Sequence, residues 1–193
     1  MDIYLSQNKI IKKSIASDVV PGPINMAKKN LLKYEIDNIE LRISDGLDSL
    51  TKKDKIDTII MSGLGNQKIT SILKKDLSKL DGINYIVVQS NTGYDRIRKE
   101  VVSLGFSIKE EILVEDNDII YVVIKFVKGN KKYTKKELYF GPVLLKNKNE
   151  LFYKMIKIGI KKNDEIIKRL PKRKILKKIK LYIKNAKLKK EIR

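Results

Sequence analysis

Strand-like and helical patterns alternate over residues 14–126, and this alternation restricts the fold more than any other feature of the sequence. Four short apolar runs have the composition of strands, at residues 14–19, 39–43, 57–61 and 85–88. Amphipathic patterns follow three of these runs, at residues 24–35, 69–80 and 97–104. Two further β-rich runs, 106–114 and 119–127, flank an acidic turn and predict a hairpin. Alternation that ends in a hairpin predicts an α/β sheet with an antiparallel edge.

Charge is distributed unevenly between the two parts of the chain. Residues 1–126 hold 19 basic and 18 acidic residues, whereas residues 127–193 hold 24 basic and 5 acidic residues. A general preference for lysine would affect both parts equally, so it does not account for this division. A polycationic segment favours nucleic acid as a partner, ahead of a merely solvated surface and of an anionic membrane surface.

The basic part contains two helical patterns on either side of Pro171. In the first pattern, apolar residues and one asparagine recur every three or four positions, at Phe152, Ile156, Ile160, Asn163, Ile167 and Leu170. In the second pattern the corresponding positions are Ile175, Ile179, Ile183 and Ala186. We expect these rows to form one seam of an antiparallel helical hairpin. The predicted domains are therefore residues 1–130, with the sheet, and residues 131–193, with the basic hairpin.

Composition excludes several kinds of site. The chain has neither cysteine nor histidine, which removes disulfides, ordinary zinc sites and histidine-based catalysis. No apolar run approaches the roughly 18 residues of a spanning helix, and the N-terminus lacks the pattern of a secretory signal. We expect a cytoplasmic monomer without a metal. We also expect no membrane partner, because the hairpin has few aromatic residues and the predicted seam would use its apolar face.

Carboxylates follow the first two strands, at the edge of the sheet where α/β proteins bind ligands. Asp18 ends the first strand, and Asp45 with Gly46 follows the second. A carboxylate at the first position suits ribose hydroxyls, and one at the second suits an adenine amino group. At the first position an aspartate that caps a helix or forms a turn is about as likely, and at the second position Asp-Gly is a common turn pair. Each position alone is therefore ambiguous.

The third and fourth strands end in small and polar residues. The third is followed by a motif with two glycines, which permits either close approach of a ligand or a tight turn: Ser62, Gly63, Leu64 and Gly65. The fourth is followed by Gln89, Ser90 and Asn91, which place amide groups at the edge of the sheet or cap the next helix. Four such ends in register along one edge favour a binding site.

These motifs, with the segment at residues 141–149, resemble the bacterial tRNA (adenine-22-N1)-methyltransferase family in order and spacing. The resemblance extends from about residue 4 to the C-terminus, and residues 141–149 are its most specific element. It implies a Rossmann-like domain that binds S-adenosyl-L-methionine, followed by a coiled-coil-like hairpin that helps to hold tRNA. The activity implied is methyl transfer to N1 of an adenine in tRNA.

The resemblance also implies roles for individual residues. Asp18 would bind the ribose of the methyl donor, and Asp45 with Gly46 would lie against its adenine. The segment Ser62, Gly63, Leu64 and Gly65 matches a cofactor loop, with Leu64 in place of the family's methionine. The segment Gln89, Ser90 and Asn91 matches a Gln-Pro-Asn loop beside the target base, with Ser90 in place of proline. Asn91 would bond to the base, Gln89 would support the loop, and Tyr4 would border the base.

The start of the chain departs from the family's pattern. Residues 2–6 fit only the last part of a glycine-containing loop with an Asp-His pair, so the family's first strand and proposed catalytic aspartate would precede Met1. We favour a segment missing from the sequence over a deliberate fragment or a decayed homologue, because the other motifs are intact. No general base is assigned, and the alternative function is a non-catalytic RNA-binding protein.

Overall fold

The computed structural model describes residues 1–192 and contains two compact units. Unit 1 consists of Met1–Asp57 and Gln67–Ile83. Unit 2 consists of Thr58–Asn66 and the chain from Asn84 onward. The predicted domain boundary near residue 130 stays a prediction.

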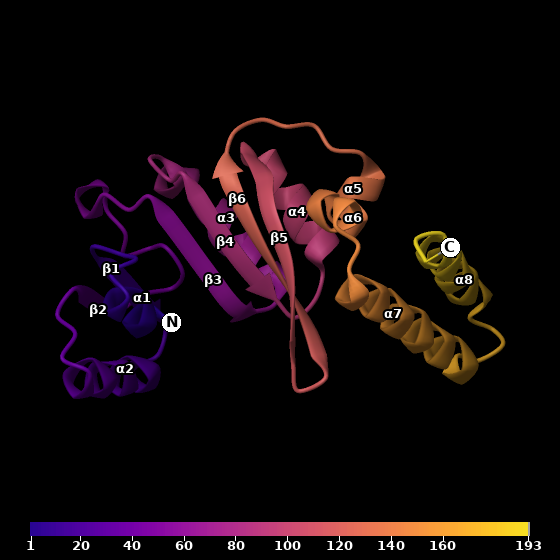
Figure 1. Ribbon diagram of the computed structural model, residues 1–193, viewed down its shortest axis with the longest axis horizontal. Coiled ribbons are helices and arrows are strands. Elements are labelled where there is room, and N and C mark those ends of the chain that lie inside the picture. Colours follow the sequence, from indigo (N-terminus) through magenta and orange to yellow (C-terminus); the bar gives the residue numbers. More distant parts are fainter. Residues whose placement is uncertain (193) are drawn as a thin grey trace. The chain divides into compact units, whose positions relative to one another are not determined.

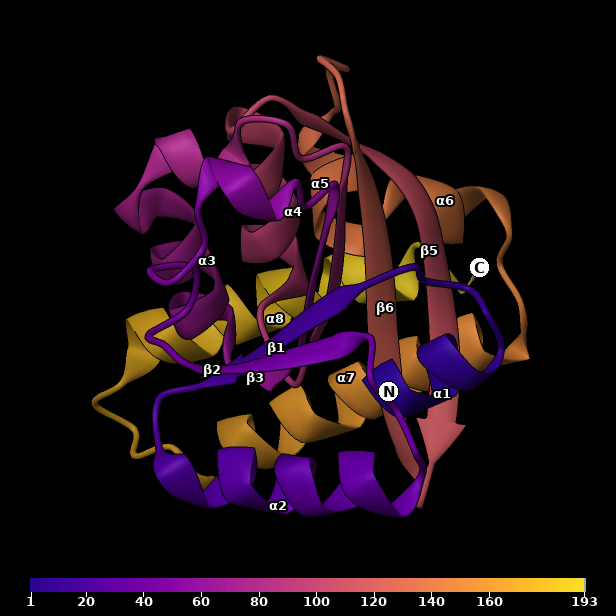
Figure 2. The same cartoon turned by 90° about the vertical axis from the view of Figure 1, so that its left-hand side faces the viewer.

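Unit 1 is built on two parallel strands, β1 (Ser14–Asp18) and β2 (Ile39–Ile43), with Ser14 opposite Ile39 and Asp18 opposite Ile43. Helix α2 (Pro21–Lys33) connects the two strands and runs alongside them (Figure 2). It begins three residues before the predicted start, because proline is tolerated in a first helical turn. The short helix α1 (Asp2–Gln7) was not predicted from the sequence.

An ion-pair network orders the loop that follows β2. Arg42 lies on β2, and its guanidinium donates to both carboxylate oxygens of Asp54 at 2.9 and 2.6 Å. The Arg42 guanidinium, with hydrogen bonds from Thr51, holds the pKa of Asp54 well below its usual range. Asp54 belongs to the short helix η1 (Lys52–Asp54), and its carboxylate also accepts the backbone N–H of Thr51. The network therefore ties the loop to the strand that carries it.

Unit 2 contains a four-stranded sheet in the order β3 (Thr58–Leu64), β4 (Tyr85–Ser90), β6 (Ile119–Lys128) and β5 (Phe106–Asp116) (Figure 1). The pair β3–β4 is parallel, and β6 is antiparallel to both of its neighbours. The predicted antiparallel edge is therefore confirmed. Helix α4 (Tyr94–Ser103) connects β4 to β5. The core of this unit consists mainly of residues from the sheet and α4: Ile59, Met61, Ile86, Val88, Ile97, Val101, Phe106, Val122, Ile124 and Phe126.

Strand β5 contains a bulge that changes which side chains are buried. Phe106 and Ile108 are buried, and the register with β6 then shifts between Ile108 and Glu110. The extra residue reverses the alternation of faces, so Glu111 is buried. The Tyr133 hydroxyl accepts the N–H of Ile108 at 2.8 Å and donates to its carbonyl at 3.2 Å. These two bonds satisfy backbone groups at the irregularity.

A buried ion pair, Arg98 with Glu111, connects the sheet to two short helices. Arg98 Nε donates to Glu111 Oε1 at 2.6 Å, and the two side chains are 2% and 0% exposed. Arg98 also donates to the carbonyls of Leu138 and Tyr139 in α5 (Lys135–Phe140). Burial lowers the pKa of Arg98, and the nearby Glu111 carboxylate acts in the opposite direction.

The other oxygen of Glu111 holds the start of α6 (Pro142–Lys146). Glu111 Oε2 accepts the backbone N–H of Val143 at 2.9 Å and that of Leu144 at 3.4 Å. Between α5 and α6 the chain turns at Gly141, which has φ +98°. A Cβ at Gly141 would lie 2.6 Å from the Glu111 carboxylate oxygens, so only glycine fits here. Gly141 thus forms a corner between two short helices that the sequence did not indicate.

The C-terminal hairpin consists of α7 (Glu150–Arg169) and α8 (Ile175–Lys189), which run antiparallel (Figure 1). The predicted seam residues of α7 are confirmed at Phe152, Ile156, Asn163 and Ile167, which are buried. Those of α8 are wrong. Ile175, Ile179 and Ile183 are 61%, 47% and 53% exposed, and Ala186 is exposed as well.

The seam of α8 instead includes Asn185 and Leu188, which are buried. Asn163 Nδ2 donates to Asn185 Oδ1 at 2.7 Å, and Asn185 Nδ2 donates to Asp164 Oδ1 at 2.7 Å. Burying an amide without a partner costs free energy, so these bonds favour the rotation of α8 that pairs the two asparagines. The row of isoleucines consequently faces outward.

Candidate functional site

In unit 1, Asp18 is the last residue of β1, and Asp45 lies two residues beyond the end of β2, the neighbouring parallel strand. The structure therefore brings these two predicted residues to one edge of the β1–β2 pair. Asp18 is half-buried, and its Oδ1 accepts the backbone N–H of Val20 at 3.0 Å. The carboxylate thus stabilises the turn into α2, and its second oxygen is available to accept a hydrogen bond from a ligand hydroxyl.

Asp45 is exposed and already has two cationic partners in α3 (Asn66–Lys75). Its carboxylate lies 2.6 Å from Lys68 Nζ and 3.4 Å from Lys75 Nζ. The hydrogen bond from Lys68 is the main reason that the pKa of Asp45 is lowered. The sequence indicated the carboxylate but not these lysines.

Gly46, next to Asp45, is required by the geometry of the turn. Its φ is +64°, and a Cβ at this position would lie 2.8 Å from the side chain of Ile72 in α3. The turn therefore lies directly against α3, and a larger residue at position 46 would move it.

In unit 2, the segments 62–66 and 89–93 form a second polar edge at the carboxyl ends of β3 and β4. The sequence predicts that Ser62 and Gln89 begin loops, but β3 extends to Leu64 and β4 extends to Ser90. A register shift between Met61 and Leu64 accommodates the extension, because it lets the strand continue through the glycine motif.

Gln89 joins the two segments of this edge. Its Oε1 accepts the backbone N–H of Gly63 at 2.7 Å, and its Nε2 donates to Asn91 Oδ1 at 3.2 Å. Gln89 thereby holds the exposed Asn91 amide in place. Because one carboxamide makes both bonds, its orientation is determined at both ends.

A second link, between Asn66 and the 91–93 turn, was missed from the sequence. Asn66 Nδ2 donates to Thr92 Oγ1 at 3.2 Å, and Ser90 Oγ donates to the Thr92 carbonyl at 3.0 Å. Gly93 has φ +70°, and a Cβ there would lie 2.4 Å from Asn66. The only sequence signal for this turn is a glycine after a run of polar residues.

The edge formed by 62–66 and 89–93 is suited to a polar ligand. Ser62, Gly63 and Gly65 are exposed, and a Cβ built on either glycine would meet no atom within 4 Å. Leu64 between them is half-buried. Hydrogen-bonding groups and open backbone therefore occur together, as a site for a nucleoside-type ligand requires. Within residues 1–192, no cluster of acidic side chains offers a metal site.

Tyr4, the remaining predicted site residue, lies on α1 in unit 1. Its side chain is 63% exposed, and its backbone carbonyl accepts a hydrogen bond from the Asn8 side chain at 2.8 Å. The ring is therefore accessible for stacking against a planar group.

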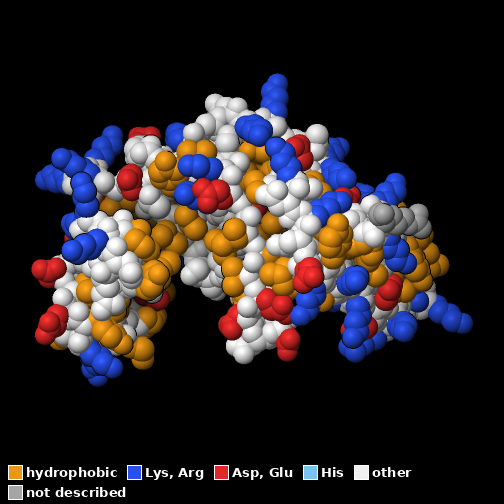
Figure 3. All heavy atoms as spheres, in the orientation of Figure 1, with side chains coloured by type: hydrophobic (Ala, Val, Ile, Leu, Met, Phe, Trp, Pro, Cys, Tyr) orange, Lys and Arg blue, Asp and Glu red, His pale blue; other side chains and the backbone are white. Residues whose placement is uncertain are grey.

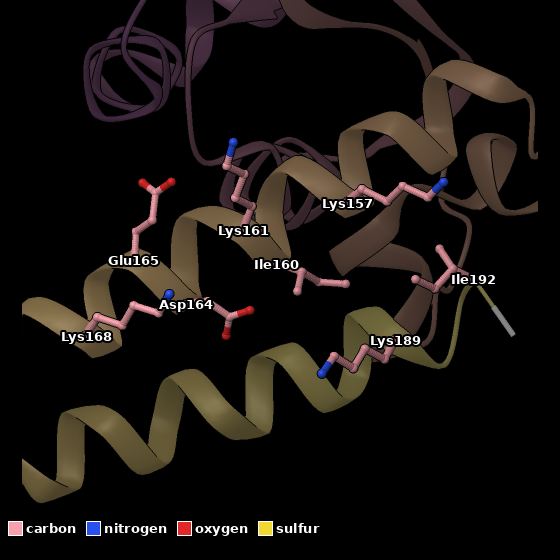
Figure 4. Close-up of a pocket in the computed structure, with 8 residues that line it drawn as sticks. All are labelled: Lys157, Ile160, Lys161, Asp164, Glu165, Lys168, Lys189 and Ile192. Carbon is pink, nitrogen blue, oxygen red and sulfur yellow. The ribbon is translucent and has the colours of Figure 1, made fainter.

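The hairpin presents a strongly basic surface (Figure 3). A shallow hollow of about 480 Å³ between α7 and α8 is lined by four lysines, two carboxylates and two isoleucines (Figure 4), namely Lys157, Lys161, Lys168, Lys189, Asp164, Glu165, Ile160 and Ile192. The excess of positive charge suits phosphate groups. Over the part of the chain that the structure describes, no helix is long and apolar enough to cross a membrane.

A known protein family matches almost the whole chain. The model of a family described as tRNA (adenine(22)-N(1))-methyltransferase matches residues 1–191. The chain is 27% identical over 158 residues to the tRNA (adenine(22)-N(1))-methyltransferase of Bacillus subtilis (strain 168), which covers 78% of this chain and 66% of that protein. A match in Mycoplasma genitalium also covers 66% of the relative, so the chain spans just under two thirds of the length of these curated relatives.

Solved structures agree with the family match. A Streptococcus agalactiae protein of the NADB-Rossmann superfamily has a TM-score of 0.93 and 30% identity, covering 100% of this chain and 85% of that chain. TrmK of M. capricolum, in complex with S-adenosyl-homocysteine, has a TM-score of 0.86 and 30% identity, covering 98% and 84%. The predicted Rossmann-like α/β fold, with its antiparallel hairpin and C-terminal helical pair, is confirmed.

Proposed function

The chain belongs to the tRNA (adenine(22)-N(1))-methyltransferase family, and we propose that it transfers a methyl group from S-adenosyl-L-methionine to N1 of an adenine in tRNA. The observation that carries the proposal is the edge of unit 2, where Gln89 bonds to both Gly63 and Asn91. It supports the proposal because residues from two family motifs, separated by 26 positions, are joined by one side chain. The proposed substrate implies a cytoplasmic location.

The residues present fit the proposed methyl donor. M. capricolum TrmK was solved with the cofactor product S-adenosyl-homocysteine, which supports the same donor here. In unit 1, we assign Asp18 to the ribose hydroxyls and Asp45 with Gly46 to the adenine. In unit 2, we assign the open backbone of Gly63 and Gly65, with the neighbouring Ser62 and Leu64, to close contact with the donor. When bound, S-adenosyl-L-methionine supplies a methyl group that is attached to a sulfonium sulfur. On transfer of the methyl group, this sulfur becomes a neutral thioether.

Asn91 is the residue that we assign to the target base. N1 of adenine lies on the Watson–Crick edge, so the base has to be unpaired and held before it can react. The exposed carboxamide of Asn91 offers both a donor and an acceptor to that edge, and Gln89 restricts its orientation. Tyr4 has an accessible ring, which suits stacking on the base.

The hairpin is the part that we assign to tRNA. Helix α8 has six lysines and no acidic residue, and α7 adds lysines around the hollow in Figure 4. Contacts of this kind with phosphates release counterions, so tRNA affinity is expected to fall steeply as salt concentration rises.

Replacement of Asn91 tests the proposal. Asn91→Ala should lower the methylation rate by about two orders of magnitude, because a base that is poorly oriented reacts slowly. Affinity for tRNA should stay within about twofold, since one amide is a small part of a polycationic interface. Transfer of labelled methyl from the donor to unmodified tRNA gives the rate, and filter binding gives the affinity. Asn30→Ala, at an exposed position of α2, is the matched control.

Two outcomes contradict the proposal. Methylation by Asn91→Ala at the control rate would remove Asn91 from the site. If the unaltered chain binds tRNA but neither binds S-adenosyl-L-methionine nor transfers methyl, the alternative of a non-catalytic RNA-binding protein holds. Calorimetric titration with the donor distinguishes these two results.

A further inference from the structure

Helix α8 carries two apolar rows, and only one of them packs against α7. The inner row includes Asn185 and Leu188, which are buried, and Leu181, which is half-buried. The outer row is exposed along its whole length and consists of Ile175, Leu176, Ile179, Tyr182, Ile183 and Ala186. Leu176 is 77% exposed. Such a row on the solvent side of a helix requires an explanation, whereas single exposed apolar residues do not.

Lysines border the outer row on both sides. At about 100° per residue, Lys180, Lys184 and Lys187 lie along one side of the row, and Lys178 and Lys189 lie along the other. No acidic residue occurs between Ile175 and Lys189. Apolar side chains over α8 are visible between lysines in Figure 3. The solvent face of α8 is therefore an apolar strip between two basic strips.

Charge decides which partner fits this face. A second copy of the chain would place lysine-bordered faces against each other, which is repulsive. RNA would neutralise the lysines but offers few apolar groups for the isoleucines and Leu176. The surface of an anionic bilayer satisfies both, because headgroups pair with lysines while acyl chains receive the apolar row.

We propose that the solvent face of α8 binds the surface of anionic membranes. This goes beyond the proposed methyltransferase function, and it uses lysines of α8 that are also assigned to tRNA. The sequence argued against a membrane partner because the hairpin has few aromatic residues and because the seam was expected to use the row Ile175, Ile179 and Ile183. The structure removes the second reason, since this row faces solvent.

The helix is held in position for such binding. Beyond the end of α8, Glu191 is buried and its carboxylate lies 2.8 Å from Lys136 Nζ and 3.0 Å from Lys148 Nζ. The seam amides Asn163 and Asn185 hold the middle of the helix. The face is about 22 Å long, from 15 residues at 1.5 Å each. It is preformed, so binding does not require α8 to fold at the membrane.

The triple variant Leu176→Gln, Ile179→Gln and Ile183→Gln tests the proposal without changing net charge. With vesicles of phosphatidylcholine containing phosphatidylglycerol, the unaltered chain should co-sediment, and the variant should bind at least about tenfold more weakly. Vesicles of phosphatidylcholine alone should bind little of either protein, because they lack anionic headgroups. Affinity of the variant for tRNA should remain within about twofold, because all lysines are retained.

Three results would overturn the proposal. Equal vesicle binding by the two proteins would show that the apolar row is not used. A loss of tRNA affinity in the variant as large as its loss of vesicle affinity would assign the row to RNA. A dimer of the unaltered chain in sedimentation equilibrium, with a monomeric variant, would assign it to a second copy.

A fluorescence measurement gives an independent readout that is insensitive to misfolding of the triple variant. The chain has no tryptophan, so Tyr182→Trp introduces a single reporter within the outer row. Its emission should shift to shorter wavelength when phosphatidylglycerol vesicles are added, because the indole enters a less polar environment. Tyr34→Trp, at an exposed position in unit 1, should not shift. A shift at position 34 and none at position 182 would contradict the assignment.

Discussion

The molecule contains two groupings of oppositely charged side chains that differ in burial. In unit 2, Arg98 and Glu111 are almost completely enclosed, and each also bonds to backbone groups. In unit 1, Asp45 pairs with Lys68 and Lys75 at an exposed edge, where all three side chains are about half exposed. The first pair joins helices to the sheet, whereas the second leaves a carboxylate that a ligand can reach.

Solvation explains this difference. Water and salt screen the exposed grouping, so its partners can exchange without a large change in free energy. The enclosed pair has no water to replace a lost partner, so removing one member leaves a buried charge unpaired. Burial therefore indicates which grouping supports the fold and which one is free to take part in binding.

The largest expected effect comes from Glu111→Ala. This change leaves Arg98 buried without its carboxylate and frees the N–H groups at the start of α6, so we expect the free energy of unfolding to fall by about 3–5 kcal/mol. Urea denaturation measures it. The double variant Arg98→Met with Glu111→Leu should be much less destabilised, because no unpaired charge remains. Equal destabilisation of both variants would mean that packing, and not charge, dominates at this position.

An intermediate effect is expected for Gly141→Ala at the same corner. The added Cβ meets the Glu111 carboxylate, and the positive φ is unfavourable for alanine. Gly82 provides a matched control, since it has φ +80° and open space around the added Cβ. We expect about 1–2 kcal/mol of destabilisation for Gly82→Ala from the backbone alone, and more for Gly141→Ala. Thermal unfolding of the two variants separates the contribution of the backbone from that of the clash.

The strands and long helices were predictable because their residues obey local patterns. Apolar runs at β3 and β4 and the helical spacing in α4 and α7 are visible without tertiary information. The buried pair was not predictable. Arg98 and Glu111 are polar residues, and Glu111 is buried only because a bulge reverses the alternation in β5.

Helix α8 shows a second limit of sequence patterns. Both of its rows have helical spacing, and the more hydrophobic row, with Ile179 and Ile183, is the natural choice for the seam. The structure buries the row with Asn185, because that amide has partners in Asn163 and Asp164. Hydrophobicity alone does not predict such pairing of polar side chains.

In the candidate site, too, some features were predictable from the sequence and others were not. The family motifs indicate its residues. The structure brings Asp18 and Asp45 to one edge of the β1–β2 pair, and Gln89 bonds to both Gly63 and Asn91. The motifs do not contain the supporting contacts, since Asn66 with Thr92 and Lys68 with Asp45 involve side chains on separate elements. Such contacts depend on tertiary structure and leave no periodic signal in the sequence.

The smallest expected effect on stability comes from Asp45→Asn, and its value lies in comparison with Glu111→Ala. The pKa of Asp45 is lowered in the folded chain, chiefly by Lys68, so its stabilising contribution exists above the ordinary pKa of about 3.9 and is lost as pH falls through the lower, folded value. At neutral pH the variant should unfold at nearly the same urea concentration as the unaltered chain, because the grouping is exposed. As the solution is acidified below about pH 4, the small remaining difference should shrink towards zero. If Asp45 contacts the adenine of the donor, affinity for S-adenosyl-L-methionine in calorimetric titration should nevertheless fall severalfold. Large destabilisation with unchanged donor affinity would place Asp45 with the enclosed pair, and burial would then be a poor guide to which charged groups bind.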